Sequence, residues 1–265
     1  MLMQNISILG CGWLGLPLAK KLLNNSFTIK GSTTSENKLE ILNNEGITPF
    51  HISLHENEVE GDIAGFLANA EILIIDVPPK AKSGEDFAKK IRTLLPYIEQ
   101  SGTDKILFIS STSVYADDAA VVTEDTSPNP VTDSGKQLVA TERLLQENKS
   151  FKTTVLRFGG LIGEDRHPVK HLAGRENLPD GDAPVNLVHR DDCIGSILKV
   201  IESNAWGETF NVVAPQHPTR KDYYTKKATE AGLPLPGFLE KERGGKIIDS
   251  TKIQELTGFT FTAGI

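Results

Sequence analysis

The stretch ISILGCGWLGLPLAKKLL, residues 6–23, decides the fold. A short β-forming run leads directly into three glycines with the spacing G-x-G-x-x-G, and a helical pattern comes next. Gly10 permits a tight turn, Gly12 lets the backbone approach a pyrophosphate, and Gly15 lets the helix pack closely on the strand. The partially positive helix N-terminus then faces the phosphates. This order predicts a dinucleotide site, with a glycine-rich turn that binds no ligand as the alternative.

The rest of the chain alternates short β-branched runs with amphipathic helical patterns. This regular alternation of strands and helices predicts a parallel sheet covered by helices on both faces, a doubly wound α/β (Rossmann) fold. The predicted strands are 6–9, 27–30, 72–77, 106–110, 153–158 and 209–213, and the predicted helices are 14–24, 35–44, 84–100, 135–146 and 191–202.

Two segments rich in Pro and Gly, 160–185 and 215–265, interrupt this alternation of strands and helices. Such segments lack the long apolar runs of sheet strands, so we expect them to form a small substrate lobe. The expected organisation is a dinucleotide-binding domain of residues 1–159, to which 186–214 returns, with the lobe beside it.

Composition excludes several classes of partner. The chain has 265 residues and a formal net charge of −7, which repels nucleic acid. Its two cysteines, Cys11 and Cys193, do not form a disulfide framework. No basic residue precedes the first apolar run, and no run reaches the roughly 20 apolar residues of a membrane span. We therefore expect a cytoplasmic protein that binds neither nucleic acid nor membranes.

The residues after the second predicted strand bear on the choice of cofactor. An NAD site carries a carboxylate about 20 residues after the glycine loop. Here a run of hydroxyls comes after Lys30, and the first acid is Glu36. Hydroxyls and a nearby amine suit a 2′-phosphate, so the sequence favours NADP, with NAD possible. Ordinary turn residues before a helix are the alternative. The hydroxyl residues are Ser32, Thr33 and Thr34.

Other candidate cofactor residues lie in the glycine loop and at strand ends. The carboxyl ends of parallel strands meet at one edge of a sheet, where dinucleotides bind. These further candidates are Trp13, Leu14, Val77, Pro78, Ser110 and Phe158.

Four further stretches follow the glycine loop in order: ILFISSTSVYADD (106–118), EDTSPNPVTDSGKQLVATERLL (124–145), VLRFGGLIGEDRHP (155–168) and VNLVHRDDCIGSIL (185–198). Together with the loop they resemble the extended short-chain dehydrogenase/reductases, in their NAD-dependent epimerase/dehydratase branch. The resemblance runs from Ile6 to about Asp192 and implies the fold and a nucleotide site.

In that family an active-site Ser or Thr lies four residues before the Tyr of a Ser-Ser-x-x-Val-Tyr strand end. Counting back from Tyr115 gives Ser111. The resemblance implies that its hydroxyl binds a substrate oxygen beside the nicotinamide. The alternative is that the hydroxyl only hydrogen-bonds backbone groups near the strand end. We assign Tyr115 to packing. Dehydration is disfavoured, because Thr112 and Ser113 stand where the family's sugar-nucleotide dehydratases carry Asp and Glu.

The family's catalytic Tyr-x-x-x-Lys pair is missing. In that pair the ammonium lowers the pKa of the phenol, which moves a proton while hydride moves to or from the cofactor. A gapless comparison puts Ser134 at the Tyr position and Leu138 at the Lys position. A shift of two residues makes Lys136 the lysine and Thr132 the tyrosine replacement. A hydroxyl is too weak a substitute without an adjacent base.

The residues that replace this pair remain candidates. Ser111, Ser134 and Lys136 are the candidate catalytic residues. For Lys136 the alternative is a solvated side chain in the first turn of a helix, without a role in the site. The family's chemistry is expected to be slow or absent unless another residue, for example from 160–185, supplies the proton.

Polar clusters downstream supply candidate substrate residues. The resemblance places the loop of Arg166 near the nicotinamide, where the side chain could clamp a phosphate or carboxylate; a surface loop is the alternative. His167 and Asn186 are further candidates. In VHRDD (188–192) we expect Asp191 or Asp192 to cap the next helix rather than to bind a metal, and no metal site is predicted.

The favoured interpretation is an atypical short-chain reductase or epimerase that acts on a small or nucleotide-linked substrate. The alternative is a non-catalytic protein that senses the redox state of the dinucleotide and signals to a partner protein. The resemblance includes relatives without the Tyr-Lys pair that act in this second way.

Overall fold

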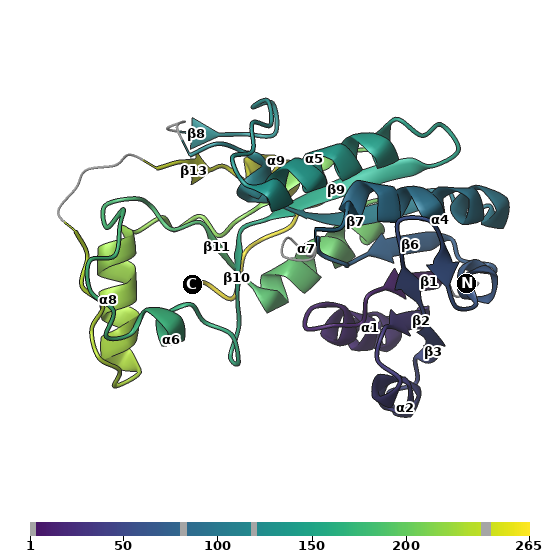
Figure 1. The fold of residues 1–265 in the computed structure, drawn as a ribbon, viewed down its shortest axis with the longest axis horizontal. Coiled ribbons are helices and arrows are strands. Elements are labelled where there is room, and N and C mark those ends of the chain that lie inside the picture. The colour runs from purple at the N-terminus through teal and green to yellow at the C-terminus, as the bar shows by residue number, and fades with distance from the viewer. Residues whose placement is uncertain (1–3, 80–83, 118–120, 240–244) are drawn as a thin grey trace.

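The computed structural model describes residues 4–79, 84–117, 121–239 and 245–265. Figure 1 shows a central sheet with helices on both faces and a smaller lobe to its left. The sheet has seven parallel strands in the order β12-β9-β7-β6-β1-β2-β3. This arrangement confirms the predicted doubly wound α/β fold.

The six predicted strands all lie in this sheet. Its strands are β1 (Asn5–Leu9), β2 (Thr28–Thr33), β3 (Thr48–His51), β6 (Ile72–Ile75), β7 (Lys105–Ser111), β9 (Lys152–Phe158) and β12 (Thr209–Val212). Its covering helices are α1 (Gly15–Asn24), α2 (Asn37–Asn44), α3 (Ile63–Leu67), α4 (Phe87–Ser101), α5 (Asp133–Gln146), α7 (Arg190–Glu202) and α9 (Thr251–Thr257).

Two apolar cores explain why the strand sequences consist mostly of apolar residues. All four residues of β6, Ile-Leu-Ile-Ile, are buried, because helices cover both faces of the strand. One core holds side chains of α1, α7 and α9, and the other holds side chains of α3, α4 and α5. β3 was not predicted. It is an edge strand, half-exposed and containing Pro49, so it carries no apolar run.

The lobe has a small core of its own, which includes Ile162, Val169 and Tyr224. The paired strands β10 (Gly160–Ile162) and β11 (Leu187–His189) connect it to the sheet domain. Contrary to the expected boundary, α9 lies outside the lobe, since it packs on β12 and α7 and its Ile253 belongs to a sheet core. The last residue, Ile265, packs against the lobe core. The lobe and connecting elements are β10 (Gly160–Ile162), β11 (Leu187–His189), α6 (Val169–Leu172), α8 (Arg220–Glu230), β8 (Val121–Val122) and β13 (Ile247–Ile248), with β4 (Ser53–Leu54) and β5 (Val59–Glu60) after β3.

The capping prediction for α7 was wrong. His189 is the N-cap, and its Nδ1 accepts from the backbone N–H of Asp191 at 3.2 Å. Asp192 is buried, and its carboxylate accepts from the backbone N–H groups of Thr262 at 2.9 Å and Ala263 at 3.3 Å. Asp192 therefore anchors the C-terminal segment, a contact across 70 residues that local capping rules do not describe.

Two kinds of feature are absent from the described part of the chain. None of its helices combines the length and apolar composition of a membrane-spanning segment. No group of three or more His, Cys, Asp or Glu in the described ranges could hold a metal ion.

Candidate cofactor and active site

A cavity of about 270 Å³ opens at the carboxyl ends of β1, β2 and β6. The strand order reverses between β1 and β6, and open α/β sheets bind ligands at such a switch point. The candidate cofactor residues that line this cavity are Gly10, Gly12, Ser32, Thr33, Thr34, Val77 and Pro78. Lining residues that the sequence did not mark as cofactor candidates include Cys11, Lys38, Ile52, Asp76, Glu85 and Lys90.

The glycine loop has room for a dinucleotide at one position. Gly10 adopts φ +108°, and its N–H donates to Ser32 Oγ at 3.0 Å. A Cβ on Gly15 would overlap the carbonyl oxygen of Gly10, so this glycine is needed for helix and strand to pack. A Cβ on Gly12 would meet nothing within 4 Å. The open side of Gly12 fits the close approach of a pyrophosphate.

Of the hydroxyl run, only Thr34 is exposed. The Ser32 hydroxyl is held by the glycine loop, and Thr33 Oγ1 accepts from the N–H of Ser35 at 3.1 Å. The nearby amine is also different from the one predicted. Lys30 Nζ donates to two backbone carbonyls around the end of α3, each at 2.7 Å, whereas Lys38 lines the cavity.

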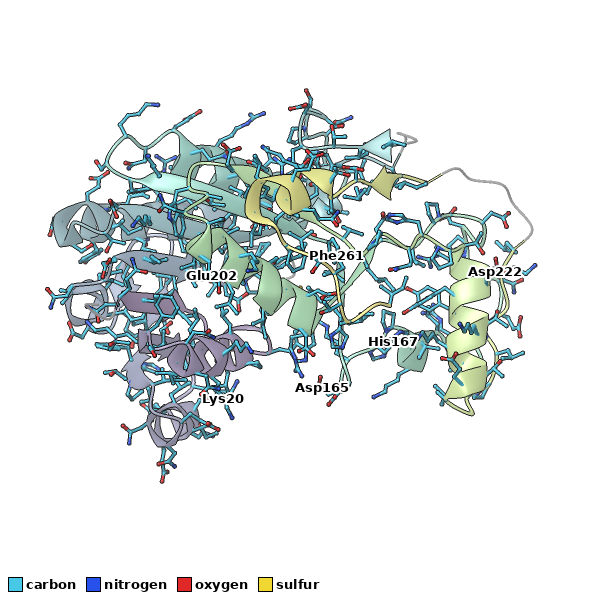
Figure 2. All side chains as sticks on the ribbon, turned by 180° about the vertical axis from the view of Figure 1, so that it is seen from behind. Lys20, Asp165, His167, Glu202, Asp222 and Phe261 are labelled. Carbon is cyan, nitrogen blue, oxygen red and sulfur yellow. The ribbon has the colours of Figure 1, made fainter. Side chains whose placement is uncertain are left out.

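Trp13 does not line the cavity, and it joins the glycine loop to the loop after β10. Its indole N–H donates to Asp165 Oδ1 at 2.9 Å. The guanidinium carbons of Arg166 and Arg190 lie 5.0 and 4.9 Å from the ring centroid, within range for cation–π attraction. Figure 2 shows Asp165 at the junction between the sheet domain and the lobe. Arg166 therefore lies next to the glycine loop, on a segment that leads into the lobe.

A buried ion pair joins β9 to α5. Arg157 of β9 donates to both oxygens of Glu142 of α5, at 2.7 and 3.2 Å, and the two side chains are 7% and 3% exposed. Arg157 also donates to the Tyr115 hydroxyl at 2.6 Å, which donates to Asn211. Burial raises the pKa of the Tyr115 phenol, so the phenol stays protonated. The side chain is packed in the core, as expected from the sequence. Ser110 donates to Glu142, so its side chain faces this pair and not the cavity.

The three candidate catalytic residues do not line the cavity. Ser111 ends β7, and its Oγ accepts from the N–H of Ser113 at 3.2 Å, which leaves its own proton free for a ligand. Ser134 lies in the first turn of α5, with Oγ 3.3 Å from Thr132 Oγ1. The Lys136 side chain is 62% exposed and pairs with Asp133 at 3.7 Å. Their catalytic roles stay predictions.

The polar atoms of His167 and Asn186 already have partners. His167 Nδ1 accepts from the N–H of Val169 at 3.1 Å and Nε2 lies 2.8 Å from the Tyr223 hydroxyl. Burial, with Lys227 and Lys170 nearby, lowers the pKa of His167. Figure 2 shows His167 on the lobe side, beside α8.

Asn186 bridges the backbone of the segment around β13. Its Nδ2 donates to the carbonyl of Lys246 at 2.8 Å, and its Oδ1 accepts from the N–H of Ile248 at 2.9 Å. Lys246, which the sequence did not single out, is buried, and its ammonium donates to the carbonyl of Tyr115 at 2.8 Å. Phe158 and Leu14 are buried in the core and do not line the cavity.

The fold, the glycine loop and the cavity define a dinucleotide-binding Rossmann protein. A family model described as NAD(P)H-binding matches residues 10–202, so the chain belongs to that family. This match confirms the nucleotide-binding family that the resemblance to NAD-dependent epimerases and short-chain dehydrogenase/reductases implied.

Individual proteins cover almost the whole chain. The Escherichia coli K12 protein YeeZ is 35% identical over 98% of this chain and 96% of its own length. A structure of UDP-glucuronic acid 4-epimerase from Bacillus cereus in complex with NAD has a TM-score of 0.82 at 20% identity, over 98% of this chain and 92% of that one. UDP-glucose 4-epimerase from Thermotoga maritima with UDP-glucose has a TM-score of 0.80 at 21% identity, over 98% and 94%.

Proposed function

We propose that this protein is an NADP-preferring reductase or epimerase of the short-chain type, with a small or nucleotide-linked substrate. The observation that carries the proposal is the glycine loop opening, at Gly12, onto a cavity at the switch point of the sheet. The similar structures named for UDP-sugar epimerases support the nucleotide-linked class. In this proposal the dinucleotide supplies hydride chemistry, Ser111 orients the substrate oxygen, and Arg166 attracts an anionic substrate group.

Other parts of the proposal rest on charge and cysteine chemistry. Cys11 and Cys193 are buried free thiols, which fits a reducing compartment such as the cytoplasm. The net charge of −7 disfavours nucleic acid as a partner.

One observation favours a second candidate, a redox sensor that signals to a partner protein. The gapless comparison puts Ser134 and Leu138 at the positions of the family's catalytic Tyr and Lys. Leu138 is buried, and neither residue exchanges protons near neutral pH.

Ligand titration followed by a turnover assay tests both candidates. NADP, NADPH, NAD and NADH are each compared by thermal shift, and a ligand at 100 times its Kd adds about 2.7 kcal/mol to stability. We expect the largest shift with NADPH or NADP. We also expect turnover, seen for a reductase as NADPH oxidation with a carbonyl substrate and for an epimerase as conversion of a UDP-sugar to its epimer with no net change in the cofactor. Tight binding with no turnover across that panel supports the sensor instead. A protein that no dinucleotide stabilises contradicts both.

Lys38 is the residue on which we base the preference for NADP. It is exposed, lines the cavity next to Thr34, and comes shortly after the strand end where a 2′-phosphate is recognised. Lys38→Glu is expected to weaken NADP binding about 30-fold, since an ammonium–phosphate hydrogen bond contributes about 2 kcal/mol. NAD binding should change far less. Calorimetric Kd values for both cofactors measure the effect.

Lys21→Glu is the matched control, because Lys21 is also exposed, lies in the last turn of α1 and does not line this cavity. Equal losses in both variants, or equal losses of NADP and NAD in Lys38→Glu, contradict a specific 2′-phosphate contact.

A further inference from the structure

One acidic side chain lies where an anion has to bind. Asp76 comes directly after β6 and lines the cavity together with Gly10 and Gly12. Its carboxyl accepts a hydrogen bond from the backbone N–H of Gly15, the first residue of α1. A helix N-terminus with a glycine loop is the place at which the pyrophosphate of a dinucleotide binds. An ionised Asp76 would repel that ligand.

Burial outweighs the one interaction that stabilises the charge of Asp76. The Gly15 N–H is its one hydrogen-bond donor among the described residues, and no described cation lies within salt-bridge distance of it. Depth in the fold removes water from the carboxyl, and this raises its pKa to about 8, although the Gly15 hydrogen bond acts in the opposite direction. Asp76 is still partly accessible from the cavity.

Several titratable side chains lie around the Asp76 carboxyl or line the same cavity, and each could change its charge. Cys11 from the glycine loop and Cys193 from α7 lie close enough for the charge of Asp76 to raise the pKa of each thiol. Lys38 of α2 is exposed at the rim. Lys90 of α4 is 2.6 Å from Glu85, so its charge is already paired. None of these groups supplies a free cation next to Asp76.

We propose that Asp76 binds the dinucleotide as a neutral carboxylic acid and donates its proton in a hydrogen bond to an oxygen of the cofactor's pyrophosphate. This rests on the dinucleotide binding of the proposed function and names a positioning residue for it. Neutral Asp76 turns a repulsive contact into a donor, and the negative charge of the bound phosphates holds the proton in place. Binding therefore takes up a proton whenever free Asp76 is ionised.

The consequence is an affinity that depends on pH in one direction. The apparent Kd equals the intrinsic Kd divided by the fraction of protein with neutral Asp76. With a pKa of about 8 this fraction is close to one at pH 7 and about one tenth at pH 9. NADPH should therefore bind about 10-fold more weakly at pH 9 than at pH 7. Uptake should be about 0.5 proton per site at pH 8 and about 0.9 at pH 9.

Calorimetry of the full-length protein with NADPH tests this, in pairs of buffers that differ in ionisation enthalpy. Asp76→Asn keeps the size and the acceptor for the Gly15 N–H, and should bind NADPH with the same Kd at pH 7 and pH 9 and without proton uptake. Glu124→Gln is the control. Burial also raises the pKa of Glu124, which accepts from the N–H of Asn211 and does not line the cavity. This variant should keep the full pH dependence.

The outcomes separate the two levels of the proposal. Wild-type protein that binds NADPH with no proton uptake at pH 9 overturns the role of Asp76 and leaves dinucleotide binding intact. Asp76→Asn that keeps the wild-type uptake also overturns it, since another group then takes the proton. Absence of binding by all four dinucleotides overturns the proposed function and the role of Asp76 with it. The wild-type measurement holds even if the variant is unstable.

Discussion

Arg157→Met is expected to lower the free energy of unfolding by about 4 kcal/mol, because it leaves the Glu142 carboxylate buried without a counter-charge. Among the described residues, Glu142 would keep the hydrogen bond from Ser110 alone, and Tyr115 would lose its shortest hydrogen bond. Methionine fills much of the space of the arginine stem, so packing contributes little to the loss. Chemical denaturation at pH 7 measures it, and Tm should fall by roughly 10 °C.

Two further variants give this result its meaning. Arg157→Met combined with Glu142→Met removes both charges and should recover most of the loss, since a buried pair replaced by apolar residues is often neutral. Lys199→Met breaks an exposed pair, Lys199 Nζ to Glu202 at 2.8 Å, and should cost no more than about 0.5 kcal/mol. Equal losses for Arg157→Met and Lys199→Met contradict the role given to burial. So does a double variant less stable than the single one.

The sheet could be predicted from sequence where strands are buried on both faces. Runs such as Ile-Leu-Ile-Ile in β6 have no polar face, and the glycine loop places a helix directly after β1. β3 could not be predicted, because its residues are half-exposed and do not form an apolar run. Its pairing with β2, a tertiary contact, makes it a strand. α9 was assigned to the lobe because sequence order does not reveal a return across the sheet.

The site could be predicted only where backbone geometry dictates the residue. Gly10 and Gly15 are needed for close approaches that no other residue allows, so spacing reveals them. Asp76 and Lys38 belong to the cavity through tertiary placement, and a single acid or lysine after a strand carries no such signal. The partners of Asn186 lie 60 and 62 residues away, which sequence proximity cannot supply.

Gly15→Ala and Gly12→Ala change the same loop by the same methyl group, and we expect both to weaken NADPH binding but only Gly15→Ala to lower stability. At Gly15 the new Cβ would overlap the carbonyl oxygen of Gly10 and lie 3.0 Å from Asp76 Oδ2, so either α1 or the loop must shift. We expect a loss of about 3 kcal/mol of stability, as for an overpacked core, and loss of NADPH binding. At Gly12 the methyl meets open space and should change stability by less than about 0.5 kcal/mol.

Gly12→Ala should nevertheless weaken NADPH binding at least about 10-fold, because its methyl occupies the space into which the pyrophosphate must come. Thermal unfolding and calorimetry with NADPH measure the two effects separately, each variant serving as the control of the other. A stable Gly12→Ala protein with wild-type affinity would mean that phosphates do not approach the backbone there, and the dinucleotide would then have to bind elsewhere. A Gly15→Ala protein as stable as the wild type would show that α1 does not need its close approach to β1.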